Sequence, residues 1–150
     1  MQPSHEEPLP RVVVLTGKAI REYFEEALTR AGASLATWVV LHGVERGGWG
    51  NQRNLAKDLR IEGATLTRHL DRMERDGLIV RTRDPGDRRQ FHVTLTPAGR
   101  TLYRRLKAAA QTTGQRATDG LSEEDQANLR RTLARIRTNV GGADADERTA

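Results

Sequence analysis

Residues 62–99 read EGATLTRHLDRMERDGLIVRTRDPGDRRQFHVTLTPAG, and this segment carries the strongest signals for the fold. Its first half places Leu66, Leu70 and Met73 at steps of four and three residues, which is the spacing of one helical face. We therefore predict an amphipathic helix whose apolar stripe is buried. Its second half predicts a short antiparallel hairpin followed by the start of a new helix.

The hairpin is predicted from two short segments that border a polar turn. Residues 78–83 and 90–95 are the expected strands, and apolar and polar side chains alternate in the second one. The turn, Asp84-Pro85-Gly86-Asp87-Arg88-Arg89, begins with residue types that favour a tight reversal of the chain. Thr96 and Pro97 suit a helix N-cap and the first helical position. Two guanidinium groups are thus expected at an exposed tip.

The chain on either side of this segment is predicted to be helical. Apolar residues recur at helical spacing, and the breaks coincide with glycines or with residues that cap helices. The expected helices cover residues 9–30, 35–46, 52–59, 97–116 and 123–140. A brief turn joins the helix at 52–59 to the helix of the opening segment, as in a helix-turn-helix unit. We predict a mainly α fold with a small β-hairpin wing, a winged helix-turn-helix.

We expect a single domain over residues 1–150. The lobe at 34–96 would hold the helix-turn-helix and the wing, while 9–31 and 97–141 would be dimerisation helices. Narrow apolar stripes on the terminal helices favour burial between two subunits, although an intramolecular bundle that covers the helix-turn-helix is the alternative. A homodimer would duplicate the helix-turn-helix across a palindromic site and so add affinity and specificity.

Composition narrows the class of partner. The formal net charge is +5, which favours a polyanion, and arginine supplies nearly all of the positive charge. A GC-rich genome would also raise the number of arginines, so their positions must carry the argument. The chain contains no cysteine, no apolar run long enough to span a membrane, and no signal peptide at its start. We expect a cytoplasmic protein without a membrane partner.

The outward surface of the predicted helix in residues 62–99 is the candidate reader of the major groove. Each residue turns the helix by ~100°. With the apolar stripe inward, Ala64, Arg68, Asp71 and Arg75 point outward, and Thr65 and Arg72 lie at the edge. The N-terminal part of such a helix usually enters the groove, so the candidate contacts are Ala64, Thr65, Thr67, Arg68 and Arg72. They suit a thymine methyl group, hydroxyl contacts, and a guanine edge or a phosphate. The alternative is a solvated face whose charges pair with one another.

The hairpin tip is the candidate reader of the minor groove. Arg88 or Arg89 would enter a narrow minor groove, where the negative potential is strongest. Asp87 is explained if its carboxylate pairs with a nearby arginine and fixes the shape of the loop. The helix and the tip together predict contact with two grooves of one duplex, so the expected partner is double-stranded DNA.

At this level of detail, residues 51–99 resemble the core of the MarR family of transcription regulators. The motifs that carry the resemblance are Leu55-Ala56-Lys57-Asp58-Leu59, Ala64-Thr65-Leu66-Thr67-Arg68, Asp76-Gly77-Leu78-Ile79, the turn at 84–89, and Leu95-Thr96-Pro97-Ala98-Gly99. The helical flanks fit as well. Ala64 departs from the family pattern, which often has a proline there.

The resemblance implies a homodimer that binds a pseudo-palindromic operator, usually as a repressor. It assigns Thr65, Thr67 and Arg68 to the major groove. It assigns Asp87 to an ion pair that stabilises the wing, and one of the two arginines that follow to the minor groove.

The resemblance also implies an effector, because many family members release DNA on binding small anionic aromatic molecules. Trp38, His42 and Arg46 recur every four residues along one predicted helix and offer a ring, a titratable donor and a cation. The alternative is that Trp38 and His42 are packing residues. The absence of cysteine counts against thiol sensing, and the absence of a tryptophan before Trp38 counts against a urate response.

An enzyme is the competing class, and the sequence disfavours it. The four histidines lack metal-ligand spacing, the three serines lie at a terminus or at expected caps, and no phosphate-binding glycine loop is present. We expect no catalytic residues, no metal and no cofactor. A protein-interaction module, or an architectural DNA-binding module without a ligand, is the remaining alternative. The operator, the regulated genes, the effector and the sign of regulation are not encoded in any motif.

Overall fold

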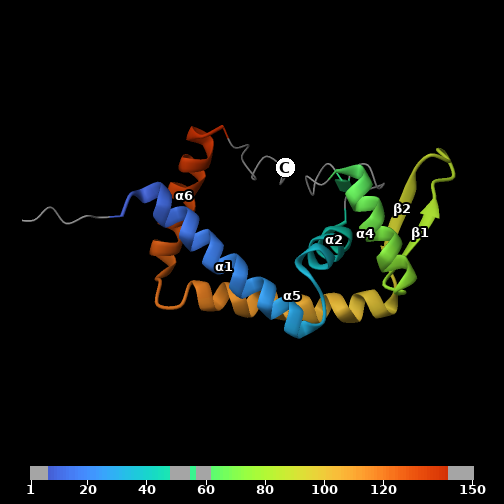
Figure 1. Cartoon of the computed structure of the whole chain (residues 1–150), viewed down its shortest axis with the longest axis horizontal. Helices are drawn as coiled ribbons and strands as arrows, with labels where there is room; N and C mark the ends of the chain where they lie inside the picture. Colours follow the sequence, from blue (N-terminus) through green and yellow to red (C-terminus); the bar gives the residue numbers. More distant parts are fainter. Residues whose placement is uncertain (1–6, 48–54, 57–61, 142–150) are drawn as a thin grey trace, which may run out of the picture. The chain divides into compact units, whose positions relative to one another are not determined.

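The computed structural model describes residues 7–47, 55–56 and 62–141, and this part of the chain is mainly helical (Figure 1). In chain order the elements are α1 (Leu9–Ala31), α2 (Leu35–Arg46), α4 (Gly63–Arg75), β1 (Ile79–Arg83), β2 (Phe91–Leu95), α5 (Pro97–Ala117) and α6 (Glu123–Asn139). The two strands form an antiparallel hairpin that pairs Ile79 with Leu95 and Arg83 with Phe91. The predicted fold class, a mainly α winged helix-turn-helix, is confirmed.

The chain divides into two compact units, residues 1–113 and residues 114–150. The first unit contains the hairpin and every helix up to most of α5. The second unit contains the end of α5 and all of α6. The predicted lobe at 34–96 and the dimerisation helices at 9–31 and 97–141 remain predictions.

The core of the first unit joins all of its described helices to the hairpin. The fully buried side chains come from α1, α2, α4, β1 and α5, together with Leu55. In α4, Leu66 and Leu70 are completely buried and Met73 is 3% exposed, so the predicted apolar stripe is confirmed. Full burial of such a side chain contributes about 1.5–3 kcal/mol, and the stripe therefore holds the outward face of α4 in a fixed orientation.

Local signals set the ends of the first two helices. The backbone of Gly32, at a φ of 103°, ends α1 in the left-handed conformation that glycine tolerates. The Ser34 hydroxyl oxygen then caps α2 by accepting the amide N–H of Thr37 at 3.2 Å. Both boundaries agree with the prediction. The expected helix at 52–59 lies largely outside the described residues. Only Leu55 and Ala56 of that range are described, and both are helical.

The hairpin is joined to α5 by the side chain of Thr96. Its hydroxyl group donates to the carbonyl oxygen of Gly77 at 2.6 Å and accepts the amide N–H of Gly99 at 3.0 Å. The predicted N-cap is therefore confirmed, and it also ties the first turn of α5 to the residues before β1. This cap lets α5 begin directly at the base of the wing.

The second unit consists mainly of α6, and its N-terminus is a capping box. The Ser122 hydroxyl oxygen accepts the amide N–H of Asp125, while the Asp125 carboxylate accepts the amide N–H of Ser122, both at 3.1 Å. No residue of α6 is buried within the chain. Leu129 and Leu133 are 47% and 40% exposed, which leaves an apolar side on this helix without a described partner.

Candidate nucleic-acid interface

Helix α4 presents the predicted outward residues on the side opposite its buried stripe. Ala64, Arg68 and Arg72 are exposed, while Thr65 and Thr67 are half-buried. The Thr67 hydroxyl donates to the carbonyl oxygen of Gly63 at 2.9 Å. The guanidinium of Arg68 lies 3.3 Å from the Thr65 hydroxyl oxygen and donates to it. The structure thus places these five side chains on or beside one accessible face.

The charge on this face is cationic. Arg68, Arg72 and Arg75 are exposed on it. Arg72 lies 3.9 Å from the Asp76 carboxylate in the next helical turn, and an exposed ion pair of this kind contributes little to stability. Arg75 donates to the backbone carbonyl oxygen of Asp71 at 3.4 Å. Asp71 is drawn instead to Arg81 on β1, at 2.5 Å. Mutual pairing of charges along α4, which was the alternative interpretation, therefore leaves most of the positive charge of this face in place.

The wing turn is held together by Asp84. One carboxylate oxygen accepts the amide N–H groups of Gly86 and Asp87, at 2.6 and 3.0 Å, and the other lies 2.6 Å from Nε2 of His92. Hydrogen bonds from the Gly86 amide, the His92 ring and the Asp87 amide together lower the pKa of the Asp84 carboxyl. Asp84 therefore remains ionised and connects the end of β1 to β2.

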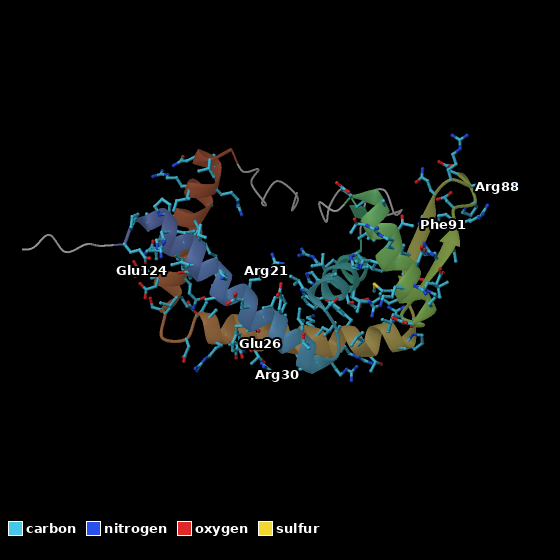
Figure 2. All side chains as sticks on the ribbon, viewed as in Figure 1. Arg21, Glu26, Arg30, Arg88, Phe91 and Glu124 are labelled. Carbon is cyan, nitrogen blue, oxygen red and sulfur yellow. The ribbon has the colours of Figure 1, made fainter. Side chains whose placement is uncertain are left out.

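Asp87 shapes the second half of the turn. Its carboxylate accepts the amide N–H of Arg89 at 3.0 Å and the side-chain amide of Gln90 at 2.8 Å. Both contacts serve the expected role of fixing the loop, and the arginine partner implied by the family remains a prediction. Arg88 and Arg89 are exposed, and Figure 2 shows Arg88 at the tip of the hairpin beyond Phe91.

Two residues of the wing were missed by the sequence interpretation. His92 was counted only as a polar position in an alternating strand, and Asp84 only as part of the turn sequence. An aspartate before Pro-Gly is a signal for a side chain that caps its own turn. The contact of Asp84 with a residue eight positions later carries no comparable local signal.

The three residues of the predicted effector pocket lie together on α2. Trp38 stacks on His42 with ring centroids 4.7 Å apart, and on Tyr103 of α5 at 5.7 Å. Phe24 of α1 meets Trp38 edge-on at 6.0 Å. The sequence interpretation missed Phe24 and Tyr103, which complete an aromatic cluster of four rings from three helices.

His42 is the polar member of this cluster. Its Nδ1 lies 3.1 Å from the phenolic oxygen of Tyr103. Burial lowers the pKa of the His42 imidazole, and the positive charges of Arg46 and Lys107 lower it further. The ring is therefore neutral at pH 7 and offers hydrogen bonding without charge. Cationic character at this place comes from Arg46 and Lys107.

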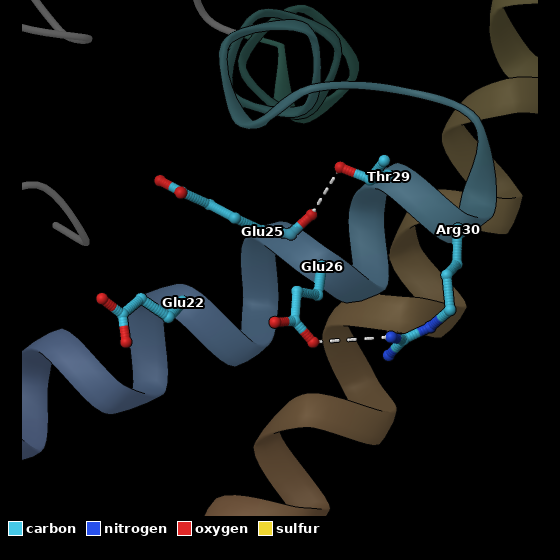
Figure 3. Close-up of a pocket in the computed structure, with 5 residues that line it drawn as sticks. All are labelled: Glu22, Glu25, Glu26, Thr29 and Arg30. Carbon is cyan, nitrogen blue, oxygen red and sulfur yellow. Dashed lines mark hydrogen bonds and ion pairs between the residues drawn. The ribbon is translucent and has the colours of Figure 1, made fainter.

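A shallow hollow of about 500 Å³ lies elsewhere, along one side of α1 (Figure 3). It is lined by Glu22, Glu25, Glu26, Thr29 and Arg30. Each carboxylate has a cation one helical turn away, since Lys18, Arg21 and Arg30 lie within 3.7 Å of the three glutamates. This surface is a solvated helix face and shows no built site.

The described residues offer neither a metal site nor a membrane span. In the described ranges, no three His, Cys, Asp or Glu side chains are grouped so that they could hold a metal ion. Likewise, none of the helices described is both long and apolar enough to cross a membrane.

The arrangement of α4 and the hairpin is that of the winged-helix class of proteins. Helix α4 buries one apolar side, the hairpin beside it has exposed arginines at its tip, and the other helices form the scaffold. Comparison with known proteins supports this class. Residues 34–91 match the MarR family. The chain is 33% identical over 95 residues to an uncharacterised HTH-type transcriptional regulator, YdgJ of Bacillus subtilis (strain 168). That alignment covers 63% of this chain and spans 58% of the length of YdgJ.

Solved structures are similar over more of the chain. The transcriptional repressor CouR bound to a 23-mer DNA duplex is 30% identical, with a TM-score of 0.77 over 87% of this chain and 92% of that one. CouR from Rhodococcus jostii RHA1 bound to p-coumaroyl-CoA has a TM-score of 0.73 at 26% identity, over 90% and 95% of the two chains. A mutant of MarR from E. coli complexed with operator DNA has a TM-score of 0.75 at 25% identity, over 87% and 94%. The chain belongs to the MarR family.

Proposed function

We propose that this protein is a transcription regulator that binds double-stranded DNA sequence-specifically as a homodimer. The observation that carries the proposal is the pair of cationic surfaces in one compact unit, the outward face of α4 and the arginine-tipped wing. Relatives of the same fold have been solved with operator DNA and with a 23-mer duplex, which supports this interpretation of the two surfaces.

In this proposal α4 is the recognition helix and enters the major groove. Its N-terminal residues reach base edges, since Ala64 suits a thymine methyl group, the hydroxyls of Thr65 and Thr67 suit base donors and acceptors, and Arg68 suits guanine. The wing crosses the backbone, and Arg88 or Arg89 enters the adjacent minor groove. The turn that Asp84 and Asp87 hold would then present these arginines without a large cost of ordering.

The homodimer is supported by apolar side chains that lie exposed on helices outside the winged lobe. On α1, Leu9, Val12, Ile20 and Tyr23 are each about 40–60% exposed. On α6, Leu129 and Leu133 are similarly exposed. Burial of these side chains between two copies would place two recognition helices on one pseudo-palindromic operator, with half-sites about one helical turn apart.

We further propose that the regulator is a repressor released by a small anionic aromatic effector. The aromatic cluster around Trp38 and His42 supplies ring surfaces, and Arg46 and Lys107 supply positive charge next to it. Because His42 is neutral, the anion would be bound by Arg46 and Lys107, with His42 as a hydrogen-bonding partner. CouR, a relative of the same fold, has been solved with p-coumaroyl-CoA, which supports an effector that joins an aromatic group to an anion.

The test of DNA binding is selection of duplexes from a random-sequence pool by the purified protein. We expect an inverted repeat to be enriched, and affinity for it to fall steeply with salt because phosphate contacts release counterions. Arg68→Ala should weaken binding by about 10- to 100-fold and relax the preference at one position of each half-site.

Arg21→Ala is the matched control. It removes an exposed arginine of α1 that pairs with Glu25 and belongs to neither of the two surfaces proposed to contact DNA. Its affinity should stay close to that of the parent protein. Enrichment of no sequence motif would contradict the proposal, and unchanged affinity and specificity in Arg68→Ala would contradict the role given to α4.

A further inference from the structure

Arg81, the middle residue of β1, is a poor candidate for DNA contact because it is turned away from solvent. Its side chain is 17% exposed, whereas its neighbours in the strand, Val80 and Thr82, are exposed. The guanidinium donates to the Glu74 carboxylate from Nη2 at 2.7 Å and from Nε at 3.1 Å. Nη2 also lies 2.5 Å from the Asp71 carboxylate. One arginine of the wing strand is thus bound to two carboxylates of α4.

The backbone takes part in the same contact. Glu74 accepts the amide N–H of Arg81 through its second carboxylate oxygen, at 3.2 Å. The sheet has only two strands, so one edge of β1 is not paired with a strand. Backbone groups alternate between the two edges of a strand, and the amide of Arg81 lies on the edge that faces away from β2. A carboxylate that binds both the backbone and the side chain of one residue restricts both the position and the rotation of the strand.

We call the group formed by Arg81, Glu74 and Asp71 the Arg81 clamp. It links β1 to α4 across the short connection between these two elements, which we call the joint. Only residues 76–78 separate the end of α4 from the start of β1. In this joint the amide N–H of Leu78 donates to the carbonyl oxygen of Met73 at 2.9 Å. That bond fixes the residue just before β1, and the clamp holds a point three residues further along the chain.

The clamp is charged in the folded protein. Hydrogen bonds from the Arg81 side chain and then from its backbone amide lower the pKa of the Glu74 carboxyl. Burial of Arg81 opposes its charge, but the bonds to Glu74 and Asp71 outweigh burial and raise the pKa of the guanidinium. Both guanidinium N–H groups converge on one Glu74 oxygen, while the other oxygen holds the backbone amide. A partly buried ion pair with several charge-assisted bonds holds its geometry better than an exposed pair between flexible side chains.

We propose that Arg81 is a positioning residue that, through Glu74 and Asp71, sets the angle between the wing and the recognition helix. With this angle fixed, Arg68 on α4 and the tip arginines Arg88 and Arg89 reach two grooves of the same duplex. The inference rests on the proposed function, since it assigns a role within DNA binding. Arg81 itself makes no contact with DNA.

The experiment compares Arg81→Met with Arg83→Met on the selected duplex. Both variants remove one arginine from β1, but the Arg83 guanidinium lies over the ring of Phe91 at 5.7 Å and outside the clamp. Hydroxyl-radical footprinting reports on the minor groove under the wing, and methylation of guanine N7 reports on the major groove under α4. Arg81→Met should lose the minor-groove protection and keep the major-groove protection, whereas Arg83→Met should keep both.

A double-mutant cycle gives an independent readout. Joint replacement of Arg88 and Arg89 by alanine should lower the affinity of the parent protein about tenfold or more. In the Arg81→Met background the same replacement should change affinity by no more than roughly twofold, because the misplaced wing no longer contributes. Arg81→Lys, which keeps the charge but loses the planar fork, should restore part of the protection.

The outcomes separate the two proposals. If the parent protein binds no duplex specifically, the proposed function fails. If the parent binds but Arg81→Met keeps its minor-groove protection and the full effect of the tip arginines, the clamp fails while the function stands. Circular dichroism and thermal unfolding identify a variant that has lost its fold. In that case Glu74→Gln, which keeps the size of the side chain, gives the same two readouts and decides the outcome.

Discussion

Gly99 occupies a point where α5 comes very close to the residues before the hairpin. A Cβ at this position would lie 2.0 Å from the carbonyl oxygen of Leu78, a distance that real Cβ atoms do not show. The Leu78 oxygen cannot retreat easily, because it accepts the amide N–H of Thr96 at 3.0 Å. The close approach therefore requires the absence of a side chain, and it explains the glycine after Thr96-Pro97-Ala98.

We predict that Gly99→Ala destabilises the protein by at least the ~1–3 kcal/mol typical of overpacking, because the clash is with backbone. Gly114→Ala is the matched control in the same helix, since a Cβ there meets nothing within 4 Å. That change should be neutral or should stabilise α5 by up to ~1 kcal/mol through helix propensity. Urea unfolding at equal protein concentration measures both. Equal stability of the two variants would contradict the tight junction.

Arginines of the same segment have different tasks, and only their surroundings distinguish them. Arg68 and Arg88 are exposed, and both are proposed to contact DNA. Arg81 is largely enclosed by α4 carboxylates and is proposed to orient the wing. Residue type alone would have assigned all three to the nucleic acid.

Among the secondary-structure elements, α1 combines a buried end with an exposed apolar side. Leu28 is fully buried in the core, whereas the earlier residues Leu9, Val12, Ile20 and Tyr23 are exposed. At ~100° per residue these four side chains lie within about 80° of one another around the helix. Val14 is also exposed but lies about 120° from Ile20, on another side.

We predict that Ile20→Glu dissociates the homodimer, because a carboxylate would be buried without a partner in an apolar interface. Val14→Glu introduces the same charge on the other side of α1 and should leave the dimer intact. Size-exclusion chromatography with light scattering measures the mass of each variant. A dimeric Ile20→Glu protein at micromolar concentration would remove this side of α1 from the interface.

For the molecule as a whole, the aromatic cluster is where three helices of the first unit share contacts. Phe24 belongs to α1, Trp38 and His42 to α2, and Tyr103 to α5. A ligand that separates or reorders these rings would act on three helices at once. Such a site can change the spacing of two recognition helices without touching DNA, provided that the ligand binds one arrangement better than the other.

We predict that salicylate or p-coumaroyl-CoA releases the selected duplex, and that Arg46→Ala raises the effector concentration required by about tenfold because an anion loses one cationic partner. Arg30→Ala, which removes a cation paired with Glu26 on α1, is the control and should respond like the parent protein. Fluorescence anisotropy of labelled duplex follows the release. A complex that neither compound dissociates would argue against this effector class.

Local sequence signals were enough to specify the described elements of this protein and most of the surface proposed to meet DNA. Helix and strand boundaries came within one or two residues, because periodicity and caps such as Ser34, Thr96 and Ser122 act over three or four positions. The outward residues of α4 followed from the same periodicity, once Leu66 and Leu70 were placed inward. The turn arginines followed from their place between two strands.

The contacts that hold these elements together were decided by the tertiary structure, because they join residues that no local sequence pattern relates. The bond between His42 and Tyr103 joins residues 61 positions apart, and the contact of Arg81 with Asp71 crosses a turn between two elements. No periodicity encodes such pairs, because they depend on how α2 meets α5 and how β1 lies against α4. The sequence of residues 62–99 therefore contains the arginines proposed to reach DNA. Only the packing of β1 against α4 distinguishes them from Arg81, which is bound to Glu74 and Asp71 and is proposed to orient the wing.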